Sequence, residues 1–169
     1  MEDRTLVQKV LNGDQLASRL LIDQYKRLVI HSVARLIDND LDREELCQDV
    51  FIKVFKNLGT FNFDAKLSTW IATIAYRMSI NFLKKKKRRM NEEDLDKVSF
   101  EIGTVDSSFE DVDYAQFINS LILQMPDNYR SILTLYHLDG FSYPEIVEIT
   151  GMPEGTVKNY LFRARKKLK

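Results

Sequence analysis

Residues 141–169 read FSYPEIVEITGMPEGTVKNYLFRARKKLK, and this stretch decides the fold of the C-terminal part of the chain. Ser142 and Glu145 have the spacing of a capping box with an early proline between them, so a helix is expected to begin at Tyr143. Gly151 is expected to end it, and a second helix runs from about residue 154 to 168. Two helices joined by so short a turn are typical of a helix-turn-helix unit.

The second of these helices has an apolar side and a polar side. At about 100° per residue, one side collects apolar residues that should pack against the first helix, namely Val157, Leu161, Ala164 and Leu168. The outward side collects Lys158, Asn159, Phe162, Arg163 and Lys166. Cations, an amide and an aromatic ring can bind phosphates, base edges and a thymine methyl group in a major groove. A helical hairpin with a solvated basic face remains the alternative.

The composition favours an all-α protein. The chain has 169 residues, of which 44% are hydrophobic, and this content is enough to bury a core. Six Gly and three Pro are few for this length, so long helices with short connections are expected. The single cysteine, Cys47, cannot form an internal disulfide. Because no apolar stretch approaches the roughly 18 residues of a membrane span, we expect a cytoplasmic protein without membrane insertion.

The charges balance overall and separate locally. Lys plus Arg and Asp plus Glu both total 25. Residues 84–89 are six consecutive bases, and residues 158–169 hold six more bases without an acid. Between them, residues 92–113 carry nine acids, and helical periodicity is lost over residues 90–110. We therefore predict two small helical domains, 1–89 and 111–169, joined by a flexible acidic linker, 90–110.

Helical periodicity covers most of the predicted N-terminal domain. Helices are expected over 1–11, from 15 to near 38, from 42 to about 57, and from 68 into the lysine run. Asp14, Asp42 with Glu45, and Ser68 are the candidate caps. The second helix should bury one stripe, composed of Leu16, Leu20, Leu21, Tyr25, Leu28, Val29, Val33 and Leu36. In the C-terminal domain, periodicity predicts further helices over 112–123 and 128–137.

The third expected helix has an outer face that suits a protein partner. Its apolar side contains Leu46, Val50, Phe51, Val54 and Leu58. The other side carries Glu45, Gln48, Asp49 and Ile52. The two acids would repel phosphates while Ile52 offers apolar area, so a protein fits this face better than DNA does. An ordinary solvated face is the alternative.

The fourth expected helix carries two stripes. The first, Ile71, Ile74, Ala75, Met78 and Phe82, should face the core. The second consists of Trp70, Thr73, Arg77, Asn81, Lys84, Lys85 and Arg88. A tryptophan followed by polar and basic groups could stack on unpaired bases and hold their phosphates. Trp70 could equally anchor the core, and the lysine run could be a flexible tail instead of a polyanion site.

These motifs together resemble a family of transcription proteins. The run DREELCQDVF at residues 42–51, then STWI at 68–71 with Ile74-Ala75 and a basic helix end, resembles region 2 of bacterial RNA polymerase sigma factors. The run LQMP at 123–126, FSYPEI at 141–146 and GTVKN at 155–159 with Arg163-Ala164-Arg165 resembles region 4. The short length and the linker resemble the small extracytoplasmic-function (ECF) class.

The resemblance implies a role for each face. Glu45, Gln48, Asp49 and Ile52 would contact the β′ clamp helices of core RNA polymerase, and region 4 would meet the β flap. Trp70, Arg77, Asn81, Lys84 and Lys85, with the loop at 62–67, would capture the opened minus-10 strand of promoter DNA. Lys158, Asn159, Phe162, Arg163 and Lys166 would enter the major groove at the minus-35 element. The linker would thread through polymerase channels near the RNA exit path, and an anti-sigma factor would regulate the chain.

The sequence also departs from the family pattern and leaves one competing function open. Tyr76-Arg77 stand where Arg-Asn is frequent, and Thr73-Ile74 replace the paired tryptophans of primary sigma factors, which predicts weaker promoter melting. The competing function is a stand-alone helix-turn-helix regulator that binds duplex DNA without polymerase. An enzyme such as a nuclease is not expected, because His31 and His137 lack metal-ligand spacing. The mechanism implied by the family requires no catalytic group and no cofactor.

Overall fold

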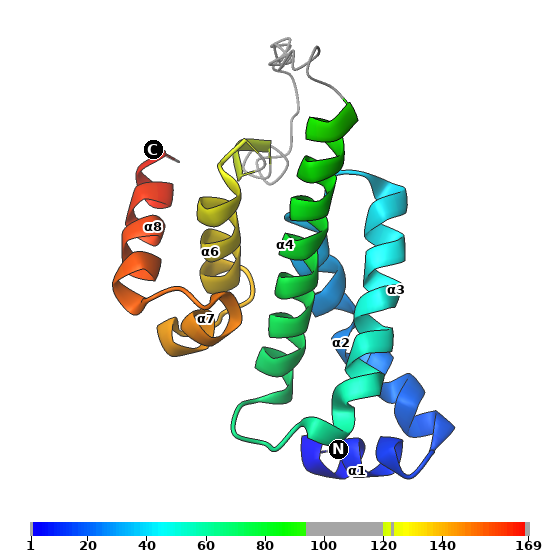
Figure 1. Cartoon of the computed structure of the whole chain (residues 1–169). Helices are drawn as coiled ribbons and strands as arrows, with labels where there is room; N and C mark the ends of the chain where they lie inside the picture. The colour runs from blue at the N-terminus through cyan, green and yellow to red at the C-terminus, as the bar shows by residue number, and fades with distance from the viewer. Residues whose placement is uncertain (1, 94–119, 123, 168–169) are drawn as a thin grey trace, which may run out of the picture.

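The computed structural model describes residues 2–93, 120–122 and 124–167, and these residues form helices with no strand among them (Figure 1). The N-terminal domain contains α1 (Asp3–Leu11), α2 (Gln15–Ala34), α3 (Asp40–Asn57), the short 3-10 helix η1 (Leu58–Thr60) and α4 (Leu67–Glu93). The C-terminal domain contains α6 (Asp127–His137), α7 (Tyr143–Thr150) and α8 (Glu154–Lys167). The prediction of an all-α, two-domain chain is confirmed.

The segment between the domains is described only at its edges. Helix α4 continues to Glu93, so the first residues assigned to the linker are helical. The remainder of the predicted linker, 94–110, lies outside the described residues. So does most of the helix expected over 112–123, of which residues 120–122 are seen as helical.

The helix starts of the N-terminal domain agree only in part with the predicted caps. Asp14 caps α2, and its carboxylate accepts hydrogen bonds from the backbone N–H groups of Leu16 and Ala17 at 2.9 and 3.1 Å. Asn39 caps α3 in place of Asp42, because its side-chain oxygen accepts the Asp42 N–H at 3.1 Å. Ser68 caps nothing, since α4 already begins at Leu67. Asn39 and Asp42 are about one turn apart and have similar preferences for the cap position, so the sequence alone does not decide which of them begins α3.

The core of the N-terminal domain lies between α2, α3 and α4. Leu21, Val29 and Val33 of α2 are fully buried, whereas Leu16 and Leu20 are 70% and 49% exposed. The predicted stripe on α2 was therefore wrong at its N-terminal end, where Ala17 is buried instead. Spacings of three and four residues fit two adjacent stripes equally well, so the pattern alone could not separate them.

The C-terminal domain has the predicted helix-turn-helix geometry. The Ser142 hydroxyl accepts the Glu145 N–H at 3.3 Å, and the Glu145 carboxylate accepts the Ser142 N–H at 2.8 Å, so the capping box is confirmed. Gly151 ends α7 with φ 73°, in the left-handed region that favours glycine. Val157, Leu161 and Ala164 of α8 are buried as expected, and Leu168 lies outside the described residues.

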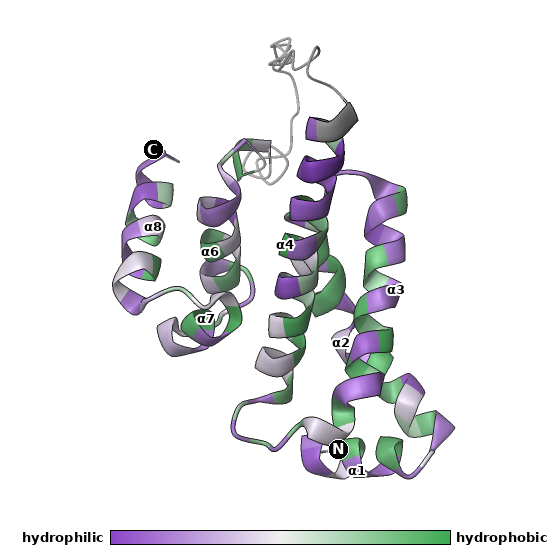
Figure 2. Ribbon diagram, in the orientation of Figure 1, coloured by the Kyte–Doolittle hydropathy of each residue, from purple (hydrophilic) through white to green (hydrophobic). Residues whose placement is uncertain are grey.

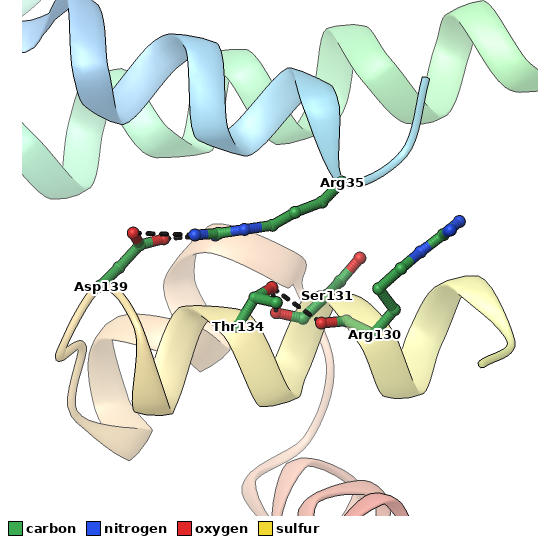
Figure 3. A network of polar contacts seen from close by, with 5 residues as sticks. All are labelled: Arg35, Arg130, Ser131, Thr134 and Asp139. Carbon is green, nitrogen blue, oxygen red and sulfur yellow. Dashed lines mark hydrogen bonds and ion pairs between the residues drawn. The ribbon is translucent and has the colours of Figure 1, made fainter. Parts of the chain in front are cut away.

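The two domains pack against each other along α4 and the end of α2. Ala72 of α4 belongs to the core of the C-terminal domain, and Tyr76 contacts the cores of both domains. Arg35 and Asp139 form a two-pronged ion pair between the domains, with side chains only 10% and 9% exposed (Figure 3). Lys66 and Glu145 make a second pair at 3.2 Å. The sequence pattern did not predict this contact between the domains, because it joins residues that are far apart in the chain.

Candidate nucleic-acid interface

Helix α4 presents three faces to three surroundings, about 120° apart around its axis. Ile71 and Ala75 lie on the face that enters the N-terminal core, and Ala72 and Tyr76 lie on the face toward the C-terminal domain. The third face carries the predicted strand-binding residues, of which Arg77, Asn81, Lys84, Lys85 and Arg88 are exposed and Trp70 and Thr73 are half-buried. Packing of the two domains therefore leaves this face open.

Trp70 combines the two roles that the sequence left open. Its ring centroid lies 5.2 Å from that of Phe61, which is a buried member of the core. The indole thus packs on the edge of the core. It is also only half-buried, so part of its surface can still meet a ligand.

The C-terminal end of α4 is strongly basic. Residues 84–89 are all exposed, and Figure 2 shows this end of the helix as the hydrophilic part of α4. No ion pair joins these six cations to another residue in the described part of the chain. Adjacent like charges on a helix repel one another, so a bound polyanion would stabilise this end.

The outward face of α8 is exposed along its length. Lys158, Asn159, Phe162, Arg163 and Lys166 are all exposed, and Phe162 retains 64% of its free surface. Lys158 pairs with Glu154 at 3.1 Å and lies 5.4 Å from the ring centroid of Tyr143. Asn159 and Arg163 therefore remain the better candidates for base contacts.

Aromatic and cation–π contacts hold α8 in its orientation. The rings of Tyr129 and Tyr160 meet edge-on at 5.1 Å, which ties α6 to α8. Arg165 lies 5.5 Å from the Tyr136 ring centroid and donates its Nε–H to His137 Nε2 at 3.1 Å. Burial, and then the charge of Arg165, lower the pKa of His137. The sequence pattern did not predict these contacts, because they join residues of different helices.

The outer face of α3 is exposed as expected and borders an apolar groove. Glu45, Gln48, Asp49 and Ile52 are all exposed, with Ile52 at 63%. A groove of about 400 Å³ between α2 and α3 is lined by Gln48, Phe51 and Ile30, among others. Ile30, which is 50% exposed, was missed. Its position on the polar side of α2 is the signal that could have identified it.

Sequence comparison identifies the family. The family model described as "Sigma-70 region 2" matches residues 21–89, and the model described as "Sigma-70, region 4" matches residues 118–168. The ECF RNA polymerase sigma-E factor of Escherichia coli strain K12 is 32% identical over 176 residues, which cover 98% of this chain and 92% of that protein. The chain belongs to the ECF sigma factors of RNA polymerase. The RNA polymerase sigma-H factor of Pseudomonas aeruginosa is 29% identical over 98% of this chain and 91% of its own length.

Two solved sigma factor structures share the fold. CnrH in complex with the cytosolic domain of CnrY matches 98% of this chain and 94% of CnrH, with a TM-score of 0.69 and 18% identity. The sigma factor RpoE of Bartonella quintana, in complex with the anti-sigma factor NepR, matches 89% of this chain and 92% of RpoE, with a TM-score of 0.69 and 23% identity. At identities below 25%, this likeness shows the common fold alone.

Two features are absent from the described residues. Among the described residues, no helix is both long enough and apolar enough to cross a membrane. The same residues contain no group of three His, Cys, Asp or Glu side chains that could hold a metal ion.

Proposed function

We propose that this sigma factor acts in the cytoplasm, binds core RNA polymerase, and directs it to promoters with specific minus-10 and minus-35 elements. The observation that carries the proposal is the presence of two exposed candidate DNA faces in one ECF sigma factor, on α4 and on α8. The polymerase supplies the catalysis, so the sigma factor needs no catalytic group.

The outer face of α3 is the proposed contact with the polymerase β′ clamp helices. Glu45 and Asp49 supply negative charge and Gln48 supplies hydrogen-bonding groups, while Ile52 is an exposed apolar anchor. Apolar anchors surrounded by polar groups are typical of protein interfaces. The adjacent groove extends the apolar area to Ile30.

The open face of α4 is the proposed site for the unpaired minus-10 strand. From Trp70 to Lys85 this face extends about 22 Å, at about 1.5 Å per residue. Arg77 and Asn81 would bind bases or phosphates along it, and the basic end would neutralise phosphates. Unstacking a base costs a few kcal/mol, which stacking on protein side chains must offset.

Helix α8 is the proposed reader of the minus-35 element. Asn159 and Arg163 are suited to base edges, Phe162 to a thymine methyl group, and Lys158 and Lys166 to phosphates. Region 4 would also contact the β flap, which would carry α8 to the upstream DNA.

The packed chain is too small to reach both promoter elements at once. The minus-35 and minus-10 elements are about 25 base pairs apart, as their names indicate. At about 3.4 Å per base pair, this spacing corresponds to about 85 Å of duplex. A compact chain of this length has a diameter of about 40 Å. The domains must therefore separate on the polymerase, and the free chain is expected to bind promoters poorly.

We also propose that an anti-sigma factor controls this chain. The structurally similar RpoE was solved with the anti-sigma factor NepR bound. An anti-sigma factor that covered the α3 face would compete directly with core polymerase.

Reconstituted transcription tests the function. Purified chain is mixed with sigma-free core polymerase on a fragmented genomic library, and initiation sites are mapped. Asp49→Lys should reduce assembly with core, and Arg163→Ala should relax the minus-35 preference, while Lys9→Ala, at an exposed control position on α1, should do neither. Absence of site-specific initiation would refute the proposal. A footprint of the isolated chain on a palindrome would instead favour the stand-alone regulator.

A further inference from the structure

A groove of about 330 Å³ lies between the C-terminal half of α4 and the start of α6. The end of α4 and the start of α6 are at the same end of the molecule (Figure 1). One wall of this α4–α6 groove comes from the N-terminal domain and the other from the C-terminal domain, so the groove exists only while the domains are packed. Its lining consists of Ile80, Leu83, Lys84, Lys87, Pro126, Asp127 and Asn128.

The wall that α4 contributes is both apolar and basic. Its four residues have the spacing of a single helix face. Ile80 and Leu83 are half-buried and form an apolar floor, whereas Lys84 and Lys87 are exposed. Lys84 also belongs to the open face of α4 that is proposed to bind DNA, and Lys87 does not. An occupant of the groove would therefore meet one cation that the DNA strand would also meet.

The two lysines are available to an anion. Among the described residues, no carboxylate lies within ion-pair distance of Lys84 or Lys87. Asp127, the acid in the lining of the groove, pairs instead with Arg130 at 2.6 Å. Because an apolar floor lies beside the cations, an anion that also carries apolar side chains fits the groove better than a phosphate does.

The chain that joins the two walls has this composition. Residues 94–119 lie outside the described residues, and they contain seven Asp or Glu and one Lys. Their densest acidic stretch is Glu110-Asp111-Val112-Asp113, which stands between Phe109 and Tyr114. Residues 109–114, the acidic segment, thus combine three carboxylates with two aromatic rings. The carboxylates suit the lysines, and the rings suit the apolar floor.

The acidic segment is also tethered on both sides of the groove. Helix α4 ends at Glu93, about 9 Å beyond Lys87 at about 1.5 Å per residue. On the other side, the chain returns through the helical residues 120–122 to Pro126, which lines the groove. Exposed ion pairs are individually weak, but a short tether gives its segment a local concentration on the order of millimolar.

We propose that the acidic segment docks in the α4–α6 groove of the free protein, with its carboxylates paired to Lys84 and Lys87 and its rings on the apolar floor. The docked segment links the two domains. It also neutralises one cation of the open face of α4, so it competes with single-stranded DNA. The docking is independent of the proposed function, and the competition rests on that function. The alternative is that these acids stay in solvent and act only through the overall charge of the chain.

Cross-linking with a carbodiimide tests the docking directly, because this reagent joins a carboxylate to a lysine amine only where the two groups touch. The full chain is treated at low concentration and digested, and the linked peptides are identified by mass spectrometry. Links from the acidic segment to Lys84 and Lys87 should exceed severalfold those to Lys85 and Lys86, which are equally exposed and do not line the groove. Equal yields at all four lysines would overturn the proposal.

Two triple variants of equal charge test the competition. The segment variant carries Glu110→Gln, Asp111→Asn and Asp113→Asn, and the control variant carries Asp94→Asn, Asp96→Asn and Glu101→Gln. Fluorescence of Trp70, the single tryptophan, reports binding of random-sequence single-stranded DNA at low salt. The segment variant should bind about threefold more tightly than the control variant.

Single substitutions on α4 then connect this gain to the groove. In a Lys87→Gln background, the difference between the two triple variants should disappear, because the segment has lost a groove partner. In a Lys86→Gln background, which removes a neighbouring cation outside the groove, the difference should persist. Saturating DNA should also suppress the cross-links to Lys84, and their persistence would overturn the competition.

The outcomes separate this inference from the proposed function. Equal DNA affinity of the two triple variants would mean that overall charge alone acts, which overturns the competition and leaves the proposed function intact. Selective cross-links to Lys84 and Lys87, in a chain that never initiates with polymerase, would support the docking and refute the proposed function.

Discussion

The titratable side chain of His137, at the end of α6, forms a hydrogen bond with Arg165 of α8. Its Nε2 atom accepts the Arg165 Nε–H at 3.1 Å, which requires the neutral imidazole. Burial and the charge of Arg165 both lower its pKa. The folded chain therefore binds a proton at this site less readily than the unfolded chain does.

Acid should weaken this contact. Because the folded pKa of His137 lies below the ordinary value of about 6.5, its stabilising contribution is present above that pH and is lost as the pH falls through the folded pKa. We expect the free energy of urea unfolding to decline as the pH falls from neutral through about 6.5, the ordinary pKa of histidine. His137→Gln should flatten this decline, and His31→Gln, which alters the only other histidine, should not. An identical pH profile for His137→Gln would contradict the prediction.

Two serine hydroxyls at the contact between the domains reveal imperfect packing. Ser32 and Ser131 are 7% and 3% exposed, and neither hydroxyl has a hydrogen-bond partner among the described residues. Both line a void of about 10 Å³ where α2, α4 and α6 meet. A buried polar group without a partner costs about 1–3 kcal/mol.

Removing one of these hydroxyls should stabilise the chain. Ser131→Ala is expected to raise the free energy of unfolding by about 1 kcal/mol, because a buried, unpaired hydroxyl is lost. Ser79→Ala is the matched control, since Ser79 is also buried in a helix but donates a hydrogen bond to the Ala75 carbonyl at 2.8 Å. Alanine improves helix propensity equally at both sites. Equal effects of the two variants in urea unfolding would refute this account.

At the scale of elements, the predictability of each helix depended on how local its determinants are. The boundaries of α7 were predicted because Ser142, Glu145 and Gly151 define them within a few residues. The start of α3 was not, because Asn39 and Asp42 have similar cap propensities. The exposed faces of α3 and α8 were predicted from the distribution of charged residues. The roles of single residues on these faces, in binding polymerase or DNA, stay predictions. The second packing face of α4 was hidden, because Ala72 contacts residues far away in sequence.

The two predicted serine caps should differ in their energetic importance. Ser142→Ala breaks the capping box of α7 and should lower the free energy of unfolding by about 1 kcal/mol. Ser68→Ala should change it much less, because Ser68 lies within the first turn of α4 and caps nothing. Thermal unfolding of the two variants, followed by circular dichroism, measures the difference. A comparable loss for Ser68→Ala would contradict the assignment of a capping role to Ser142 alone.

At the scale of the whole molecule, the contact between the domains is suited to opening. It combines a buried ion pair, a second, partly exposed pair and unpaired hydroxyls with apolar packing around Ala72 and Tyr76. Contacts of such mixed polarity within a chain resemble transient interfaces more than a continuous core. The candidate DNA faces of α4 and α8 are both exposed while the domains are packed. Packing therefore leaves each face accessible and fixes only the distance between the two faces.

The Arg35–Asp139 pair should control how often the domains separate. Asp139→Asn keeps the size of the side chain and removes its charge, which leaves Arg35 buried without a counter-charge. Breaking a buried pair from one side costs about 3–5 kcal/mol, and Arg35 escapes this cost when the domains part and water reaches it. The variant should therefore populate open forms without losing helix content.

Energy transfer between two dyes measures this opening. With Cys47 replaced by serine, dyes on cysteines placed at the exposed positions Lys53 and Pro153 report the separation of α3 from the α7–α8 turn. Asp139→Asn should lower the transfer efficiency, and Asp23→Asn should not, because Asp23 forms an exposed pair with Lys26. Combining Arg35→Asp with Asp139→Arg should restore the packed form. Unchanged transfer in Asp139→Asn would mean that apolar contact alone holds the domains, and that polymerase must overcome that contact before both promoter elements can be reached.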